Sequence, residues 1–356
     1  MNLSKQEQIE KIICESQDPE PFSGVIVLST LEGKPFLERA YGPAIRSEKI
    51  PNRIDTRFQT ASGSKIFTSV AVCKLVEDGN ITLNTRISDC IEVDFPNFDP
   101  AITIRQLLTH SSGITSYFEE DIDPDYEALW RDYPMYKVRP PKDFLPLFQN
   151  KHMKFLPGDH FEYNDGGFIL LGIAVETITG KSFTEAIQEY VFKPAGMADS
   201  GYYAADQLPE RTAYAYIKNP DGRWRTNIFA VPIIGAPDGG AYTTAPDMHR
   251  FWQALRGGLL LNPDLTVALL TPQIETDWES PYTGYGYGVW IEQAEDSIRK
   301  IFVEGYDPGV SFRSAYYPGE DLLLTLIGNT ANALWPVYQK IEQTLLDSSI
   351  SFSFSN

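Results

Sequence analysis

The stretch that decides the fold covers residues 58–79 and reads FQTASGSKIFTSVAVCKLVEDG. Most positions from Ile66 to Val76 are apolar, which predicts a helix that is buried almost all round. Gly79 supplies a stop signal for this helix. Whatever lies at the N-terminal end of the helix is therefore expected to lie deep in the molecule.

That N-terminal end reads Ala-Ser-Gly-Ser-Lys, from residue 61 to residue 65. A serine and a lysine three residues apart share a helix face, so the Lys65 amine can reach the Ser62 hydroxyl and act as its base or hold its base. Alternatively, Ser62 only caps the helix. However, a cap favours Glu or Gln at the third position, and the helix dipole disfavours a cation there. Lys65 is thus an unfavourable residue for the first turn of a helix, which indicates a functional site. Burial at this place is expected to lower the pKa of Lys65.

Outward from this helix, both ends of the chain have β-rich patterns. Residues 22–41 predict a hairpin with a turn at Glu32-Gly33. Near the other end, residues 300–305, 310–318 and 321–329 predict a three-strand meander, because Asp-Pro-Gly and Pro-Gly turns separate them. A terminal helix is expected over residues 333–347.

The middle of the chain is expected to be mostly helical. Helical patterns cover residues 62–78, 103–110, 166–178 and 182–192, in addition to an amphipathic pattern over residues 1–16. The second of these begins with a capping box, Thr103 to Gln106. The simplest division of the chain into domains is a discontinuous α/β domain (1–60 and 200–356) around a mostly helical domain (61–199). The active site is expected at the interface between them.

Composition narrows the classes of function. The 356 residues carry 30 basic and 48 acidic side chains, a net charge of −18, which repels nucleic acid and anionic membrane surfaces. Three cysteines without metal or disulfide spacing are expected to be reduced thiols. No apolar run approaches the roughly 18 residues that span a bilayer, and no secretory pattern is present. We therefore expect a cytoplasmic protein with no membrane partner.

Further motifs follow in one order along the chain. They are ITIRQLLTHSSGI (102–114), FLPGDHFEYNDGGFILLGIAVETITG (155–180), GGAYTTAPDMHRF (239–251), YGYGVW (285–290) and VEGYDPGVSFRSAYYP (303–318). Together with residues 58–79, this order strongly resembles the serine β-lactamase and penicillin-binding-protein superfamily, nearest its branch of class C β-lactamases, D-amino-acid peptidases and esterases. The resemblance implies an α/β (α+β) fold of the β-lactamase/transpeptidase type, an antiparallel sheet flanked by helices plus an inserted, mostly helical domain.

The same resemblance implies roles for individual residues. Ser62 of the Ser-x-x-Lys motif would be the acylated nucleophile, with Lys65 as its partner. Tyr163, from the family's Tyr-x-Asn motif, would relay the proton between nucleophile and leaving group. The backbone N–H groups of Ser62 and Tyr306 would form the oxyanion pair, and Gly305 would let the substrate approach the strand.

Two positions depart from the family pattern. Asp165 stands where the family has asparagine, and its charge beside Lys65 would favour the ammonium form. The same charge could bind a cationic acyl group of the substrate, such as a free α-amine. Alternatively, Asp165 only caps the helix that begins near Gly166.

Val303 stands where the family's third motif, which follows Ser-x-x-Lys and Tyr-x-Asn, has lysine or histidine. The cation of that third motif is therefore absent. Glu304 cannot take its place without a bulge, because successive strand residues face opposite ways. Arg313 on the following strand is a possible replacement whose direction the sequence does not fix.

Other residues favour structural roles. The four histidines have no zinc-ligand spacing, so neither a metal nor a cofactor is expected. His110 is expected to be a packed, hydrogen-bonded residue below the site. The aromatic residues between Tyr117 and Phe155 could equally line the pocket or cover the core.

The leading interpretation is a serine hydrolase that forms an acyl-enzyme with a small ester, amide or peptide. Without the third-motif cation, which usually meets a substrate carboxylate, an esterase or a D-amino-acid amidase or peptidase is favoured over a true β-lactamase. The alternative is a catalytically impaired relative with a binding or regulatory role. The sequence leaves the acyl donor and the oligomeric state open.

Overall fold

The structure is a computed structural model that describes residues 5–15, 20–33, 35–119, 122, 125–276, 283–294 and 297–346. Residues 1–4 and 16 of the predicted N-terminal helix and residue 347 of the predicted C-terminal helix lie outside the described residues, as does the side chain of Cys14. Cys73 and Cys90 are free thiols.

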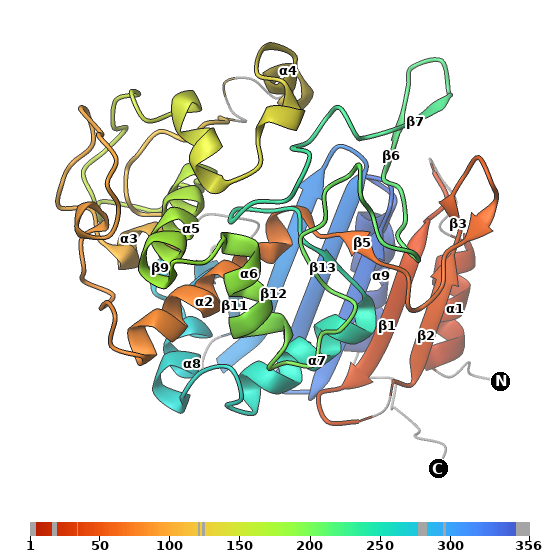
Figure 1. Cartoon of the computed structure of the whole chain (residues 1–356). Helices are drawn as coiled ribbons and strands as arrows, with labels where there is room; N and C mark the ends of the chain where they lie inside the picture. Colours follow the sequence, from red (N-terminus) through yellow and green to blue (C-terminus); the bar gives the residue numbers. More distant parts are fainter. Residues whose placement is uncertain are drawn as a thin grey trace.

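An antiparallel sheet of eight strands forms the centre of the described part of the chain, in the order β2-β1-β14-β13-β12-β11-β10-β9 (Figure 1). Its strands are β1 (Gly24–Thr30), β2 (Leu37–Tyr41), β9 (Ile274–Glu275), β10 (Thr283–Tyr285), β11 (Trp290–Ala294), β12 (Ser297–Asp307), β13 (Val310–Tyr317) and β14 (Leu322–Gly328). The predicted hairpin (β1 and β2) and the predicted meander (β12, β13 and β14) are confirmed. Because β1 pairs with β14, strands from both ends of the chain share this sheet.

Helices cover both faces of the sheet (Figure 1). On one face, α1 (Lys5–Glu15) and α9 (Leu334–Leu346) pack against each other and against apolar side chains of β1 and β14. The other helices belong to the larger core on the opposite face and the region beyond it. They are α2 (Lys65–Glu77), α3 (Ile104–Leu108), α4 (Tyr126–Asp132), α5 (Asp165–Thr179), α6 (Phe183–Ile187), α7 (Ala245–Arg256) and α8 (Pro263–Leu269). The mixed fold class predicted from the sequence is confirmed.

Short elements complete the described chain. Three two-stranded ribbons pair β3 (Pro43–Ile45) with β4 (Ile50–Pro51), β5 (Phe58–Gln59) with β8 (Tyr242–Thr243), and β6 (Tyr216–Lys218) with β7 (Trp224–Thr226). The helical pattern predicted over 182–192 is α6 continued by a π-helical turn, Gln188–Phe192. Thr103 and Gln106 form the predicted capping box of α3.

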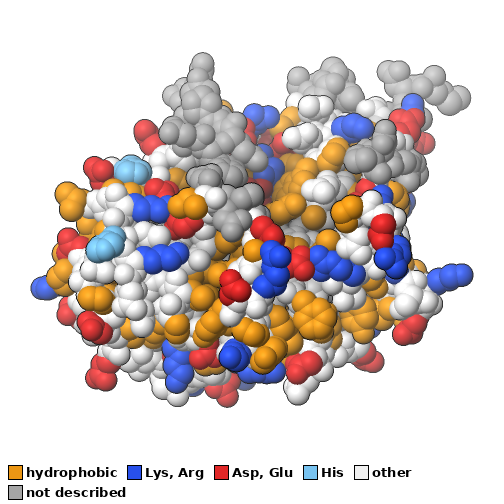
Figure 2. Space-filling model, turned by 90° about the horizontal axis from the view of Figure 1, so that it is seen from above, with side chains coloured by type: hydrophobic (Ala, Val, Ile, Leu, Met, Phe, Trp, Pro, Cys, Tyr) orange, Lys and Arg blue, Asp and Glu red, His pale blue; other side chains and the backbone are white. Residues whose placement is uncertain are grey.

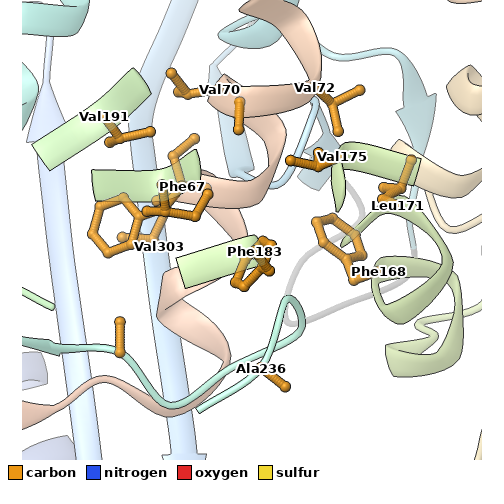
Figure 3. Packing of buried hydrophobic residues seen from close by; sticks show 14 of the residues in the cluster. Phe67, Val70, Val72, Phe168, Leu171, Val175, Phe183, Val191, Ala236 and Val303 are labelled. Atoms are coloured by element: carbon orange, nitrogen blue, oxygen red, sulfur yellow. The ribbon is translucent and has the colours of Figure 1, made fainter. Parts of the chain in front are cut away.

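Helix α2 lies in the middle of the larger core, as its apolar sequence predicts. Phe67 and Val70 pack among side chains from α5 and from the sheet, including Phe168 and Val303 (Figure 3). The solvent-exposed fraction of Phe67, Val70 and Phe168 is 0%. The N-terminal end of α2 is therefore held rigidly from several sides.

The first turn before α2 differs from the prediction. The predicted helix over 62–78 begins as a 3-10 turn, η1 (Ala61–Ser64), and becomes α-helical only at Lys65. Ser62 caps neither segment, because the residues before them are Thr60 and Ser64 and neither makes a side-chain cap. Ala61 has a φ of 45°, a conformation that costs energy for a residue with a side chain. The capping role considered for Ser62 is wrong, which leaves its hydroxyl available for other contacts.

Within the described residues, no helix is both long enough and apolar enough to cross a membrane. The domain boundaries, 1–60 with 200–356 and 61–199, stay a prediction.

Candidate active site

Ser62 lies on the wall of a cleft of about 990 Å³. The C-terminal end of β12, the start of α5, the segment before β8 and the loop around α4 all contribute to this cleft. Its lining mixes carboxylates with aromatic rings, and Lys218 is the one lysine or arginine among the described lining residues. The cleft therefore places a serine hydroxyl next to acidic and aromatic side chains.

Lys65 connects the nucleophile candidate to its surroundings. Its Nζ donates to Ser62 Oγ at 3.1 Å, to Asp165 Oδ1 at 2.6 Å and to the backbone oxygen of Asp238 at 2.5 Å. The residue is only 1% exposed to solvent. The structure thus brings together the serine, the lysine and the aspartate that the sequence singled out, with all three ammonium protons satisfied.

The charge state of Lys65 follows from these neighbours. Burial on its own lowers the pKa of the ammonium, but the carboxylates of Asp165 and Asp238 more than offset this and raise the pKa above its usual value. Burial acts on the pKa of Lys65 in the expected direction, but the net shift is upward. The expectation that Asp165 favours the ammonium form agrees with the structure.

Tyr163 lies beside this pair. The Nζ of Lys65 is 4.8 Å from the centre of the Tyr163 ring, and the ring is parallel to that of Trp290. Burial and the charge of Asp165 raise the pKa of the phenol well above its usual value, although the Ser62 hydroxyl acts in the opposite direction. Tyr163 is therefore a neutral phenol at neutral pH.

His110 supports Tyr163 from below, as the sequence analysis expects. The backbone N–H of Asn164 donates to His110 Nδ1 at 3.0 Å, so the remaining ring proton is assigned to Nε2, which is 3.1 Å from Tyr285 Oη. The rings of His110 and Tyr163 lie 4.4 Å apart. Burial and the charge of Lys65 keep the pKa of the imidazole well below its usual value.

The start of α5 explains why Asp165 faces Lys65. Asn164 caps the helix: its side chain accepts from the backbone N–H of Gly167 at 2.8 Å and donates to the oxygen of Ile114 at 2.6 Å. Asp165 occupies the first helical position. The alternative in which Asp165 only caps this helix is wrong, because its neighbour caps it.

Strand β12 approaches the nucleophile turn closely at Gly305. A Cβ atom added at Gly305 would lie 2.0 Å from the backbone oxygen of Thr60 and 2.8 Å from the backbone nitrogen of Gly63. Only glycine therefore fits between β12 and η1. Gly305 and Tyr306 line the cleft with Ser62, and their oxyanion and substrate-binding roles stay predictions.

No cation stands in for the missing third-motif lysine in the described part of β12 and β13. The register is continuous from Val303 to Asp307, without a bulge, and the Val303 side chain is buried in the core. Glu304 faces the other way and forms an ion pair with Arg313. Arg313 also lies over the rings of Phe302, Trp335 and Tyr338 on the α9 side of the sheet. Arg313 itself is not among the described lining residues, although its partners Glu304 and Trp335 line the cleft.

Two further carboxylates line the cleft, Asp238 and Asp307, and neither was predicted from the sequence. Asp238 Oδ2 accepts a hydrogen bond from the Tyr117 hydroxyl, and burial with the charge of Asp165 raises the pKa of Asp238 to about 6. Burial and the charges of Asp165 and Asp238 raise the pKa of Asp307 to about 8. The available signals were Asp238-Gly239-Gly240 and Asp307-Pro308-Gly309, which look like ordinary turns in the sequence.

Known proteins resemble this chain in sequence and in fold. The solved structure of a penicillin-binding protein from Bacillus halodurans is 45% identical, covers 94% of this chain and 99% of its own, and superposes with a TM-score of 0.89. Penicillin-binding protein 4* of Bacillus subtilis is 25% identical over 345 residues, which are 92% of this chain and 73% of that protein. A D-stereospecific amidohydrolase from Streptomyces sp. shares the fold, with a TM-score of 0.76, 21% identity and coverage of 96% and 98%. The model of the family described as Beta-lactamase matches residues 9–342, so the chain belongs to the Beta-lactamase family.

Proposed function

We propose that this protein is a serine hydrolase that forms an acyl-enzyme on Ser62 from a small ester or amide. The observation that carries the proposal is the 3.1 Å hydrogen bond from Lys65 Nζ to Ser62 Oγ on the wall of the large cleft. Membership of the Beta-lactamase family supports it, as does the position of Tyr163 next to both groups.

The chemistry follows from these positions. Ser62 Oγ bonds to the carbonyl carbon while its proton passes to the Tyr163–Lys65 pair, and the carbonyl electron pair moves onto oxygen. The backbone N–H groups of Ser62 and Tyr306 stabilise that oxyanion. When the intermediate collapses, the bond to the leaving group breaks and the leaving group takes the proton. Water then adds to the acyl-enzyme, which releases the acid and restores the Ser62 hydroxyl.

The resting protonation state limits this reaction at neutral pH. The pKa values of Lys65 and Tyr163 are both raised, so the pair holds both of its protons. The competent form has lost one of them, and its population increases with pH. Activity should therefore rise on the alkaline side of neutrality.

The cleft favours substrates without a carboxylate. Lys218 is the one basic residue in the described lining, whereas Asp165 and Asp238 place negative charge near Ser62. Asp307, whose pKa is raised to about 8, adds little charge at neutral pH. A substrate carboxylate would be repelled there. An esterase or an amino-acid amidase or peptidase fits better than a true β-lactamase. The cytoplasmic location remains a prediction.

The second candidate is a catalytically impaired relative that binds ligands. The protonated Lys65–Tyr163 pair and the missing third-motif cation favour it. A serine-reactive fluorophosphonate separates the two candidates, since only a competent nucleophile reacts with it. After proteolysis, the hydrolase should carry the label on the peptide containing Ser62.

Two variants control the labelling experiment. Ser62→Ala should remove the label. Ser64→Ala should keep most of it, because the Ser64 hydroxyl is already engaged: it donates to the backbone oxygen of Ala61 at 3.1 Å and accepts from the backbone N–H of Ala241 at 3.3 Å. An unlabelled natural protein would favour the binding role, and a label on Ser64 would overturn the choice of nucleophile.

A further inference from the structure

Two elements that are far apart in the sequence border the cleft on one side. One is α4, whose first residues Tyr126 and Glu127 line the cleft. The other is the ribbon of β6 and β7, of which Ile217, Lys218 and Trp224 line the cleft. Both elements lie at the top of Figure 1, on the side that faces the reader in Figure 2, where acidic and basic side chains lie close together. We call this border of α4 and the ribbon the rim of the cleft.

An ion pair joins the two elements of the rim. Arg225 Nη2 donates to Glu127 Oε2 at 2.5 Å, although the two residues are 98 positions apart in the sequence. The guanidinium is also held on its own side, because Arg225 Nε donates to Asn219 Oδ1 at 3.1 Å. Glu127 lies in the first turn of α4, where the helix dipole favours a carboxylate. Each partner is thus held in place by its own element.

The two elements pack against different parts of the chain. In α4, the rings of Tyr126 and Trp130 meet edge to face at 5.5 Å, and Trp130 is only 4% exposed to solvent. In the ribbon, the ring of Trp224 lies 3.7 Å from the guanidinium of Arg46, which follows β3 directly. The Glu127–Arg225 pair therefore reaches from one packed region to another.

A deeper contact joins the same two regions next to Lys65. There the hydroxyl of Tyr117, which precedes α4, donates to Asp238, which follows β7, and both residues are buried. By contrast, the side chains of Glu127 and Arg225 are 34% and 36% exposed to solvent. The deep contact is shielded from water, whereas the contact at the rim is open to it.

The strength of the rim contact follows from this exposure. An ion pair accessible to water shifts an equilibrium by a factor of about five at most. Salt weakens it further, because the screening length falls from about 10 Å at 0.1 M to about 3 Å at 1 M. Such a contact adds little to the stability of the fold, but it is strong enough to change how often the rim is open.

We infer that the Glu127–Arg225 ion pair limits the size of the acyl donor that reaches Ser62. While the pair is formed, small esters enter the cleft, and a bulky acyl donor enters only when the pair is broken. The two residues thus determine specificity without touching the reacting atoms. The inference rests on the proposed serine hydrolase function and adds to it a control of access to the same site.

The test compares two neutral esters with the same leaving group, 4-nitrophenyl acetate and 4-nitrophenyl 3,3-diphenylpropanoate. Release of nitrophenolate gives kcat/KM for each ester, and the quantity followed is the ratio of the bulky to the small ester. In Glu127→Gln and in Arg225→Gln this ratio should rise about three- to fivefold, because each variant breaks the ion pair. Glu127→Gln keeps the size of the side chain, so a rise in that variant is an effect of charge. An unchanged ratio in both variants would overturn the inference.

The double variant shows whether the two residues act through each other. Its ratio should equal that of each single variant, because the same ion pair is already broken in both. Effects that multiply in the double variant would show two independent influences on the rim and would contradict the inference.

Arg223→Gln is the matched control. Arg223 lies in the turn of the same ribbon and pairs with Asp221 of that turn at 2.7 Å, so this variant removes a cation from the ribbon without breaking a contact to α4. Its ratio should stay that of the unaltered protein. A rise equal to that of Arg225→Gln would show a general charge effect and overturn the inference.

Salt provides a measurement that needs no folded variant. Between about 0.05 M and about 0.5 M NaCl, the ratio should rise in the unaltered protein, because screening weakens the ion pair. In the double variant it should stay level. A ratio that does not respond to salt in the unaltered protein would overturn the inference.

The inference and the hydrolase proposal fail in different ways. If the fluorophosphonate labels Ser62 and both esters are hydrolysed, but neither the variants nor salt change the ratio, the inference fails and the hydrolase proposal stands. If neither labelling nor hydrolysis occurs, the hydrolase proposal itself fails, and the inference fails with it.

Discussion

Asp165 Oδ1 lies 2.6 Å from Lys65 Nζ, in an ion pair whose lysine side chain is 2% exposed to solvent. An asparagine at this position would offer a neutral amide instead. The carboxylate raises the pKa of Lys65 and also that of Tyr163. Asp165 therefore favours the protonated forms of both candidate proton acceptors, together with Asp238 at Lys65 and burial at Tyr163.

Asp165→Asn should move the alkaline rise of the rate to lower pH by about one unit or more, because both pKa values fall when the negative charge is removed. The pH profile of kcat/KM for a neutral ester measures the shift. Asp159→Asn serves as a control, since the side chain of Asp159 is 65% exposed. An unmoved profile in Asp165→Asn would show that the ion pair does not set the working pKa.

Gly305→Ala should destabilise the protein by about 1–3 kcal/mol and strongly reduce fluorophosphonate labelling. The added methyl group would meet backbone atoms of Thr60 and Gly63, which cannot rotate away, so η1 or β12 must shift. Urea unfolding and the labelling rate measure the two effects. Gly319→Ala, where no atom lies within 4 Å of the added Cβ, should change neither. Normal labelling in Gly305→Ala would contradict the close fit.

Neutral esters such as nitrophenyl butyrate should be hydrolysed more efficiently than penicillins and cephalosporins. Val303 provides no cation, and Arg313 is bound to Glu304 on the α9 side of the sheet, so a β-lactam carboxylate finds no described partner at the third motif. Values of kcat/KM for the two substrate classes provide the test. Efficient cephalosporin hydrolysis by the unaltered protein would overturn this explanation.

His110 should make the protein less stable in mild acid. Its pKa in the folded state is depressed, so the unfolded chain binds more protons below pH 6.5, and the free energy of unfolding falls as the pH decreases from there. The slope is about 1.4 kcal/mol per pH unit for one such group. His110→Gln keeps an acceptor for the Asn164 N–H and should show a shallower decline in urea unfolding between pH 7.5 and 5.5. Parallel curves for the two proteins would show that His110 is not responsible.

The features that could be predicted from the sequence are those that depend on residues close together in the chain. The Ser62–Lys65 contact depends on three-residue spacing, and the capping box of Thr103 on a four-residue motif, so both could be found without a fold. Asp238 and Asp307 could not, because only tertiary packing brings these two turns to Ser62. For Lys65, the sequence indicated both the lowering of the pKa by burial and the opposing charge of Asp165. The contribution of Asp238, 173 residues further along the chain, depends on tertiary packing.

The contact between Gly305 and the turn that holds Ser62 has a consequence for biosynthesis. Ser62 is made early, but β12, which supports its turn, comes from the last sixth of the chain, and β1 gains its partner β14 later still. A ribosome has to release the chain through β12 before the nucleophile can be locked in place. Incomplete translation products that lack β12 should therefore be inert toward acyl donors.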